Sequence, residues 1–314
     1  MDCWIQGLGE VVCMNENKII RIFKRILYDY IYIPLKILSK DKRALFGLIV
    51  LIIYILMSII GPIFVPLSLE PNMEERYQPP SWKHPLGTDF AGRDIFAQIV
   101  NGGRDILIAA FLAGFVTIGL GTIIGLIAGY IGGKVDIIVT TLIDIFLTIP
   151  GFPLLMIIAT WLLQSGITVN ILMIAFLLSI TSWAGLARSV RSQVLSIKQE
   201  PFIEVDKCLG LSKFHIIFKE ILPNAMPYIA INFMLSSVSA VYSYTGLMAL
   251  GLIPYTPGNW GAMIHMAQAY VGTITGAGCW YIIAPSFVII ILQVSLVFLS
   301  NGIDKIFNPR LREW

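Results

Sequence analysis

The stretch EVDKCLGLSKFHIIFKEILPNAMP, residues 204–227, is the most informative part of this chain. It carries charged residues between segments that are very apolar on both sides. Pro201, just before it, suits the first turn of a helix, because the N–H that proline lacks has no partner there. Gly210 can adopt the left-handed backbone that ends a helix, and Ser212 can cap the next one. The pattern therefore predicts two short helices joined by a tight turn, before Pro223 and Pro227 start the next long helix.

The predicted first short helix, residues 202–209, has an apolar face and several charges. Phe202, Val205 and Leu209 recur at the spacing of one helix face. The charged residues could fix the register of this segment in the cleft of a partner; they are Glu204, Asp206, Lys207 and Lys213. A solvated loop without a role is the alternative, although such connections are usually shorter than this one.

The composition around this segment is that of a membrane protein. Of the 314 residues, 57% are hydrophobic and only 13% are charged, and the mean hydropathy is +0.80. Soluble domains carry about 25% charged residues, so this chain has too little polar surface to coat a soluble globule. No basic patch is interleaved with aromatic residues, which argues against a nucleic acid partner. The four cysteines (Cys3, Cys13, Cys208 and Cys279) have no metal-ligand spacing, so free thiols are expected.

Long uncharged runs predict six membrane spans, each of which needs about 20 apolar residues. The first span covers about residues 44–66, and the run 106–133 holds the second. Residues 145–187 hold two spans with a tight turn at 164–166, and the run 221–303 holds the last two, separated by the polar residues 253–279. Small residues let helices approach closely in lipid, and the second run contains five glycines: Gly114, Gly119, Gly121, Gly125 and Gly129. The expected fold is an all-α, polytopic membrane protein.

The distribution of Lys and Arg orients these spans. With six spans, all of the 22 Lys and Arg residues fall on the side of the two termini except Arg76, Lys83, Arg93 and Arg104. The positive-inside rule therefore predicts that both termini are cytoplasmic. The expected layout is a cytoplasmic N-terminal segment (1–43), a first span, an extracytoplasmic segment (67–103) and a core domain (104–312) with the other five spans. We expect residues 18–40 to form a basic amphipathic helix, which either lies on anionic lipid or docks a partner, and residues 1–13 to be an over-called start or a dispensable extension.

Four pieces of the chain, in order, carry a family resemblance. They are His84–Asp89 (HPLGTD) with Gly92–Asp94, then Asp136 and Asp144 before Pro150 and Pro153, then Glu204–Asn224, and last Gly251–Gly261 with Asn308–Arg310. Over about residues 40–312 they resemble the "C"-type permease of the dipeptide, oligopeptide and nickel ABC importers. Val205 and Asp206 stand where that family often has alanines, and Glu220 stands where this branch commonly has His. Thr141 stands where the family often has Arg, which leaves the ion pairing of Asp144 open.

The resemblance implies a type I importer permease in the cytoplasmic (inner) membrane, working by alternating access on di- or oligopeptides, oligosaccharides or a nickel chelate. It implies as partners a homologous second permease, two ABC ATPase subunits and an extracytoplasmic solute-binding protein. Residues 191–223 would be the cytoplasmic loop by which the ATPase moves the permease, with Glu204, Asp206, Lys207, Gly210, Leu211 and Ser212 in contact. The chain is not expected to be an enzyme or to hold a cofactor, because Ala128 and Val135 break the nearest match to a P-loop around Gly133-Lys134.

Polar residues inside the spans are candidates for the translocation path. They are Asp144 in the third span and Asn232, Ser236, Ser239 and Ser243 in the fifth. For Asp144 the alternative is an acid near the cytoplasmic end of its span, and for the others it is hydrogen bonding between helices. The stretch Pro150–Pro153 is expected to break the third span, as a hinge or as a packed kink.

The external Trp82, Trp260 and Trp280 either face a docking binding protein or anchor the chain at the membrane interface. The three histidines, His84, His215 and His265, are isolated and are expected to be structural.

Two other classes of function compete with the importer permease. A self-sufficient secondary carrier or channel usually shows internal repeats, and no clear repeat is seen in this sequence. A purely structural membrane scaffold would need no polar residues along the fifth span.

Overall fold

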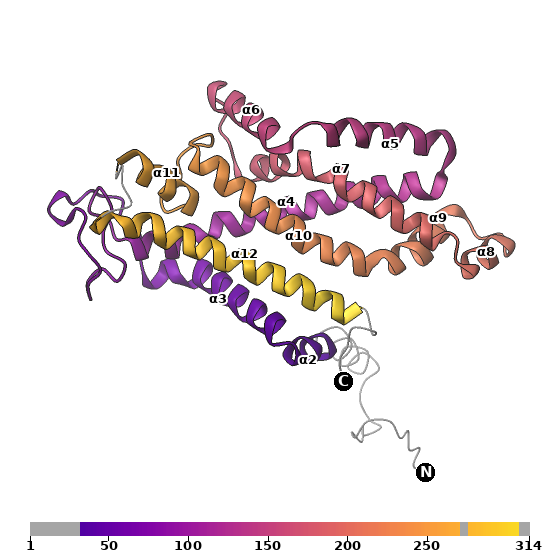
Figure 1. The fold of residues 1–314 in the computed structure, drawn as a ribbon, viewed down its shortest axis with the longest axis horizontal. Helices are drawn as coiled ribbons and strands as arrows, with labels where there is room; N and C mark the ends of the chain where they lie inside the picture. The colour runs from indigo at the N-terminus through magenta and orange to yellow at the C-terminus, as the bar shows by residue number, and fades with distance from the viewer. Residues whose placement is uncertain (1–31, 271–275, 308–314) are drawn as a thin grey trace, which may run out of the picture.

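A computed structural model describes residues 32–270 and 276–307, and this part of the chain is built from helices and loops with one isolated β-bridge (Figure 1). The helices are α2 (Ile33–Lys40), α3 (Lys42–Phe64), α4 (Ile95–Ile131), α5 (Gly133–Thr148), α6 (Gly151–Gln164), α7 (Ile171–Ile197), α8 (Pro201–Cys208), α9 (Lys213–His215), α10 (Leu222–Ala249), α11 (Trp260–Tyr270) and α12 (Trp280–Phe307). A π-helix, η3 (Ile216–Ile221), joins α9 to α10, and two short 3-10 turns are η2 (Met73–Glu75) and η4 (Ala277–Cys279). The predicted extension 1–13, most of the amphipathic stretch 18–40 and the motif Asn308–Arg310 lie outside the described residues.

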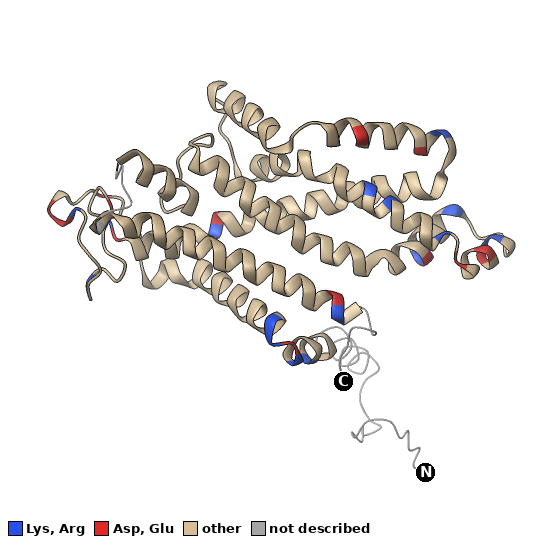
Figure 2. Cartoon of the chain, viewed as in Figure 1, with Lys and Arg blue, Asp and Glu red and all other residues tan. Residues whose placement is uncertain are grey.

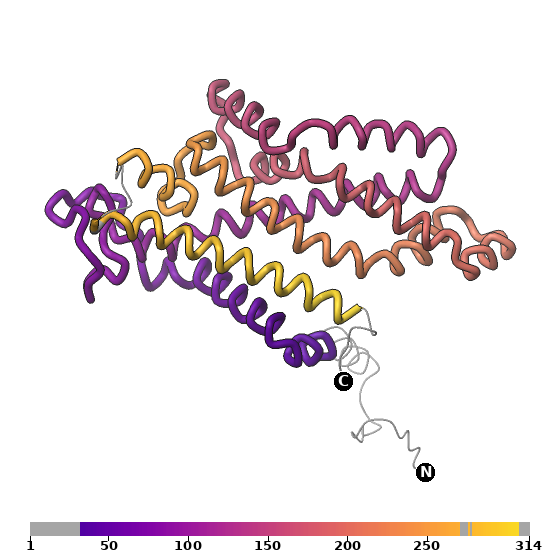
Figure 3. Tube along the Cα trace, viewed as in Figure 1, coloured from indigo at the N-terminus to yellow at the C-terminus, as the bar shows by residue number. Residues whose placement is uncertain are grey.

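The long helices run side by side along the longest axis of the molecule, as the tube in Figure 3 shows. The two ends of this bundle are built differently. The loop 65–94 and α11 lie at one end, and α8, α9 and the end of α12 lie toward the other. Most of the described Lys, Arg, Asp and Glu residues lie toward these two ends, and few lie in the middle of the bundle (Figure 2). This distribution is that of a chain whose central part lies in lipid.

Within the described residues, five helical segments are long and apolar enough to cross a membrane: α3, α4, α7, the run Lys213–Ala249 and α12. α5 and α6 together form a sixth candidate span, but they are bent by 79° at the break between them. The prediction of six spans therefore holds if this bent pair counts as one. The turn predicted at 164–166 is confirmed, because α6 ends at Gln164.

The break between α5 and α6 falls at the predicted place. Ile149 is extended, with φ −80° and ψ 125°, and Pro150 follows it. The residue before a proline is sterically kept out of the helical region, so the chain leaves α5 here and begins α6 at Gly151.

α4 is longer than its uncharged run predicted. It begins at Ile95, inside the segment 67–103 that was predicted to be an extracytoplasmic connection. The Asp94 side chain accepts hydrogen bonds from the backbone N–H groups of Phe96, at 2.7 Å, and Ala97, at 3.2 Å. This N-cap starts the helix about three turns before the apolar run, so the second span continues outward as a rigid extension.

Glycines of α4 bring α7 into close contact, in agreement with the prediction that they favour close helix packing. A Cβ added at Gly121, Gly125 or Gly129 would lie within 2.9 Å of α7 atoms, including the Leu186 side chain and the Ala187 carbonyl oxygen. Gly114 packs in the same way against Ser237 of α10, but Gly119 faces open space, so the packing prediction is wrong for that one residue.

The fifth long helix begins earlier than predicted. Pro223 and Pro227 were expected to start it, but α9, η3 and α10 form one continuous helical run from Lys213 to Ala249. The wider π-helical turn directly before Pro223 explains this difference, because it moves the preceding carbonyls away from the proline ring. The Asn224 side chain also donates to the Glu220 carbonyl oxygen at 2.6 Å.

Candidate coupling segment and transport path

The segment between α7 and α10 has the predicted first short helix and the predicted turn, but no separate second short helix. Pro201 lies in the first turn of α8, and Gly210 follows the helix with φ +75°. Ser212 caps α9 by accepting a hydrogen bond from the backbone N–H of His215 at 3.2 Å, and α9 is the start of the long helical run Lys213–Ala249. A tight turn therefore joins α8 to this run at one end of the molecule (Figure 1).

The apolar residues of α8 divide into one that is buried and three that are not. Ile203 is fully buried in a cluster that also contains Val194, Ile216 and Ile221. Phe202, Val205 and Leu209, the predicted apolar face, are 39%, 57% and 70% exposed. α8 therefore rests on the bundle through Ile203 and turns its main apolar face away from the rest of the chain.

The remaining predicted contact residues surround this face. Glu204, Lys207, Gly210 and Ser212 are exposed, whereas Asp206 and Leu211 are half-buried. One carboxylate oxygen of Asp206 is buried without a hydrogen-bond partner within the described residues. Phe214 and Phe218, both exposed, extend the apolar surface with ring centroids 4.4 Å apart. The structure thus brings the predicted residues together on one protruding unit.

Both acids of α5 form ion pairs with arginines of α7. Arg191 donates from Nη2 to Asp136 Oδ2 at 2.6 Å, and Arg188 pairs with Asp144. The ion-pair partner of Asp144, which the sequence left open, is thus an arginine of a different helix. The Thr141 hydroxyl donates instead to the Ile137 carbonyl oxygen of its own helix. Arg188 and Arg191 were predicted to lie in the connection between spans four and five, but α7 continues to Ile197 and contains both. The sequence did contain a signal for these ion pairs: two acids and two arginines flank apolar runs that were predicted to form adjacent spans.

The predicted path residues of α10 share one face of the helix. Asn232, Ser236, Ser239 and Ser243 follow one another at steps of four, three and four residues, so their side chains lie along one side. Ser239 is exposed and the other three are half-buried, whereas Ser237, Val241 and Tyr244 on the opposite side are buried. Asn232 donates to the Tyr228 carbonyl oxygen of its own helix at 2.9 Å, and not to a neighbouring helix.

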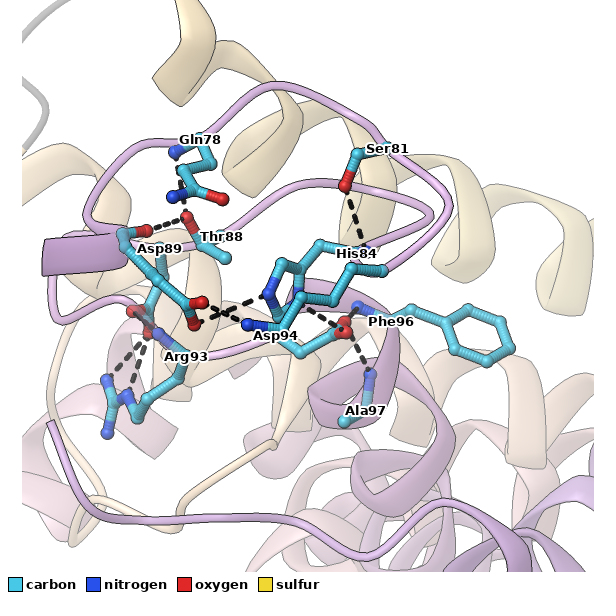
Figure 4. A network of polar contacts seen from close by, with 11 residues as sticks. Gln78, Ser81, His84, Thr88, Asp89, Arg93, Asp94, Phe96 and Ala97 are labelled. Carbon is cyan, nitrogen blue, oxygen red and sulfur yellow. Dashed lines mark hydrogen bonds and ion pairs between the residues drawn. The ribbon is translucent and has the colours of Figure 1, made fainter. Parts of the chain in front are cut away.

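The HPLGTD–GRD motif forms a compact polar network at the outer end of α4 (Figure 4). The Asp89 carboxylate is fully buried and accepts from Arg93 Nε and Gln98 Nε2, both at 2.9 Å, as well as from backbone N–H groups. His84 Nδ1 lies 3.0 Å from Asp94 Oδ2, so one carboxylate caps α4 and holds the imidazole. Lys83 donates a hydrogen bond to Glu75 and lowers the pKa of that carboxyl below its usual value. This network fixes the loop 65–94 on the outer end of α4.

Trp260 does not have either of its predicted roles. It was expected to face a docking partner or to anchor the chain at the interface, but it is fully buried at the start of α11. Its Nε1 donates to the Ile99 carbonyl oxygen at 2.9 Å, and its ring meets Tyr54 edge-on at 5.7 Å. A Cβ added at Gly103 of α4 would lie 2.9 Å from the indole ring, so the absence of a side chain there makes room for Trp260. Trp82, in contrast, is fully exposed.

Comparisons with known proteins agree with this architecture. Residues 121–313 match the family model of the binding-protein-dependent transport system inner membrane component, and residues 35–80 match that of the N-terminal TM domain of oligopeptide transport permease C. The dipeptide transport system permease protein DppC of Bacillus subtilis is 32% identical over 304 residues, which cover 96% of this chain and 92% of that protein. The oligopeptide transport system permease protein OppC of the same organism is 32% identical over 275 residues, covering 87% of each chain. OppC of Haemophilus influenzae is 29% identical over 277 residues, covering 87% of this chain and 86% of its own length.

These matches extend over the five long helices, the bent pair α5–α6 and the α8 segment, and they set aside a self-sufficient carrier, a channel and a scaffold. A component of a binding-protein-dependent system works in a complex with an ATPase and a binding protein. The chain belongs to the binding-protein-dependent transport system inner membrane component family, as a multi-pass permease subunit of an ABC transporter in which other subunits hydrolyse ATP.

Proposed function

We propose that this permease imports dipeptides and oligopeptides by alternating access. Its relatives are named as dipeptide and oligopeptide permeases, which supports this choice of substrate over oligosaccharides or a nickel chelate. In this proposal the working complex contains a second, homologous permease, two ATPase subunits and an extracytoplasmic solute-binding protein.

The residues 191–223, with α8 at their centre, are the coupling segment in this proposal. The observation that carries it is the exposed apolar face Phe202, Val205 and Leu209 on a helix that the bundle holds through Ile203. Apolar side chains gathered on a protruding unit and rimmed by charges are typical of a protein–protein interface. Glu204, Asp206 and Lys207 would fix the register in the ATPase cleft, and Gly210, Leu211 and Ser212 would hold the turn.

The translocation path follows the polar face of α10 in this proposal. Asn232, Ser236, Ser239 and Ser243 present polar groups on a side of α10 that this chain leaves partly open. A polar strip inside a membrane-spanning helix is costly against lipid, so the second permease would close a water-filled path over it. Asp144, which is also incompletely covered, would lie at the inner part of this path.

The layout of the chain follows from these assignments. The segment 1–43 would be cytoplasmic, the segment 67–103 would face the binding protein with Trp82 exposed, and the residues 104–312 would form the transporting core.

Two leucine variants test the coupling assignment. Leu209→Ser removes apolar surface from the exposed face of α8, and Leu69→Ser makes the same change in the loop 65–94 at the opposite end of the molecule. Losing about 1.4 kcal/mol of binding free energy weakens binding tenfold, so we expect Leu209→Ser to reduce retention of the ATPase subunits by about tenfold in a pull-down from detergent. Leu69→Ser should retain them as wild type does. Equal retention by both variants would contradict the coupling role of α8.

Substrate uptake into proteoliposomes tests the transport assignment. The complex with its own ATPase and binding protein should accumulate a labelled dipeptide only when ATP is present. Excess unlabelled oligopeptide should compete, whereas an oligosaccharide or a nickel chelate should not. ATP-driven uptake of nickel or sugar in place of peptide would overturn the substrate assignment and leave the permease assignment intact.

A further inference from the structure

Two arginines of α7 and the lysine that follows its last residue reach across to the hairpin formed by α4 and α5. Arg188 pairs with Asp144 and Arg191 pairs with Asp136, both on α5. Lys198, directly after α7, donates from Nζ to the Tyr130 carbonyl oxygen in the last turn of α4 at 2.7 Å and lies 5.5 Å from the centre of its ring. The connection from α4 to α5 is therefore held on both sides of Gly132 by residues of a single helix.

The two ion pairs differ in how far water reaches them. The side chains of Arg188 and Asp144 are 52% and 55% exposed, whereas those of Arg191 and Asp136 are only 25% and 19% exposed. Thr140 adds a hydrogen bond to Asp136 Oδ1 at 3.3 Å. Since screening weakens exposed pairs most, Asp136–Arg191 is the pair that resists separation of α5 from α7.

Close apolar packing lies beneath these polar contacts. α4 and α7 touch at Gly125 and Gly129, where an added Cβ would lie 2.7 Å from the Ala187 carbonyl oxygen and 2.8 Å from the Val194 side chain. Ile143 of α5 is fully buried in a small cluster with Ala184 and Ala187 of α7. Helices packed at this distance slide or separate as rigid pieces, because interiors are close-packed and do not deform continuously.

The same end of α7 continues almost directly into α8. Only Lys198–Glu200 separate the two helices, and these residues form turns whose backbone N–H groups bond Val194, Ser196 and Ile197. Ile203 of α8 is buried together with Val194 of α7 and Leu126 of α4. A force on α8 is therefore passed to α7 within one or two helical turns, and the polar contacts pass it on to α4 and α5.

We propose that Asp136–Arg191, with Lys198 on the Tyr130 carbonyl, is a clasp that makes the α4–α5 hairpin move together with the coupling segment. The proposal rests on the proposed function, in which α8 receives the motion of the ATPase. Asp136, Arg191 and Lys198 are positioning residues in this role: they touch neither ATP nor the transported solute. Without the clasp, the ATPase would still dock and turn over, but its motion would move the hairpin less completely.

The test compares ATP hydrolysis and solute uptake in the whole transporter in proteoliposomes. We expect Asp136→Asn and Arg191→Gln to lower uptake by about tenfold, within the range of coupling free energies between distant sites, while ATP hydrolysis stays within about twofold of wild type. The number of ATP molecules hydrolysed per solute transported therefore rises. Asp136→Glu and the exchanged pair D136R/R191D should bring this ratio back toward that of wild type. Asp41→Asn is the matched control, because it removes an ion pair between α3 and α12 that does not involve α7.

Each possible result either supports or contradicts the clasp. An unchanged ratio in Asp136→Asn and Arg191→Gln, or an equal fall of hydrolysis and uptake that the exchanged pair does not repair, overturns the clasp. Retention of the ATPase subunits, measured on the same preparations, separates this result from failure of the proposed function. If wild type retains the ATPase and Leu209→Ser loses it, the coupling segment stands whatever the clasp variants show.

Discussion

Gly102 is the residue at which the outer loops press most directly on a membrane-spanning helix. It lies in α4, and a Cβ at this position would be 1.7 Å from the Gly258 carbonyl oxygen and 3.1 Å from Trp260 Cδ1. Trp260 is held in place, since it is fully buried and its Nε1 donates to the Ile99 carbonyl oxygen. The absence of a side chain at Gly102 is therefore what allows the loop before α11 to close on α4.

Gly102→Ala should destabilise the protein. The added methyl group meets backbone and cannot be relieved by turning a side chain, and such overpacking costs about 1–3 kcal/mol or more. Gly119→Ala is a matched control in the same helix, because nothing lies within 4 Å of a Cβ there. It should gain roughly 0.5–1 kcal/mol from the better helix propensity of alanine. Thermal unfolding of the two variants in detergent checks both signs, and a Gly102→Ala variant as stable as wild type would contradict this account.

At the scale of the element, the sequence was sufficient where local chemistry decides the structure. Pro201, Gly210 and Ser212 each act within one helical turn, and α8 (Pro201–Cys208) lies one residue before the predicted 202–209 at each end and is followed by the predicted turn. The break at Pro150 is confirmed for the same reason, since a proline restricts the residue before it whatever surrounds it.

The predictions that failed depend on distant parts of the chain. Trp260 looks interfacial in sequence, and only the glycines of α4, more than 150 residues away, show that it is buried. The pairing of Asp136 and Asp144 with α7 depends on the antiparallel register of two helices that an uncharged run does not specify. The early start of α4 depends on whether Asp94 caps a helix or lies in a loop, and the surrounding network decides this.

Asp94 tests this last point at the start of α4. Asp94→Ala removes the acceptor of the Phe96 and Ala97 N–H groups and of His84, and loss of an N-cap costs about 0.5–2 kcal/mol. Asp94→Asn keeps an oxygen that can cap the helix, so it should lose clearly less. Thermal unfolding in detergent measures the stability, and hydrogen exchange of the amides at 95–98 shows whether the first turn frays. If alanine and asparagine cost the same, the cap is not what starts α4.

At the scale of the whole molecule, the proposed function makes this chain one half of a transporting unit rather than a closed bundle. The outer surfaces of α5 and α6 carry large exposed apolar side chains, among them Ile137, Ile138, Ile157 and Trp161. The polar side of α10 is also incompletely covered. Such surfaces fit lipid on one side and a second permease on the other, which is the arrangement that the proposed import of peptides requires.

An ion pair joins the first and last described spans, at the start of α3 and near the end of α12. Lys305 Nζ of α12 lies 2.9 Å from Asp41 Oδ2 at the start of α3, and the other oxygen of Asp41 accepts from the Arg43 and Ala44 N–H groups. The hydrogen bond from Lys305, with the backbone N–H groups adding to it, lowers the pKa of Asp41 below its usual value. The folded form therefore binds the Asp41 proton more weakly than the unfolded form does.

This difference predicts a pH dependence of the free energy of unfolding. Because the folded pKa is the lower one, the stabilisation is complete above the unfolded value of about 4 and is lost as the pH falls through the folded value. Asp41→Asn keeps the helix cap but removes the charge, so wild type should be more stable than the variant at pH 6, by up to about 1 kcal/mol. The difference should shrink toward zero near pH 3 in thermal unfolding followed in detergent. Parallel pH profiles for the two proteins would show that Asp41 does not join α3 to α12 through its charge.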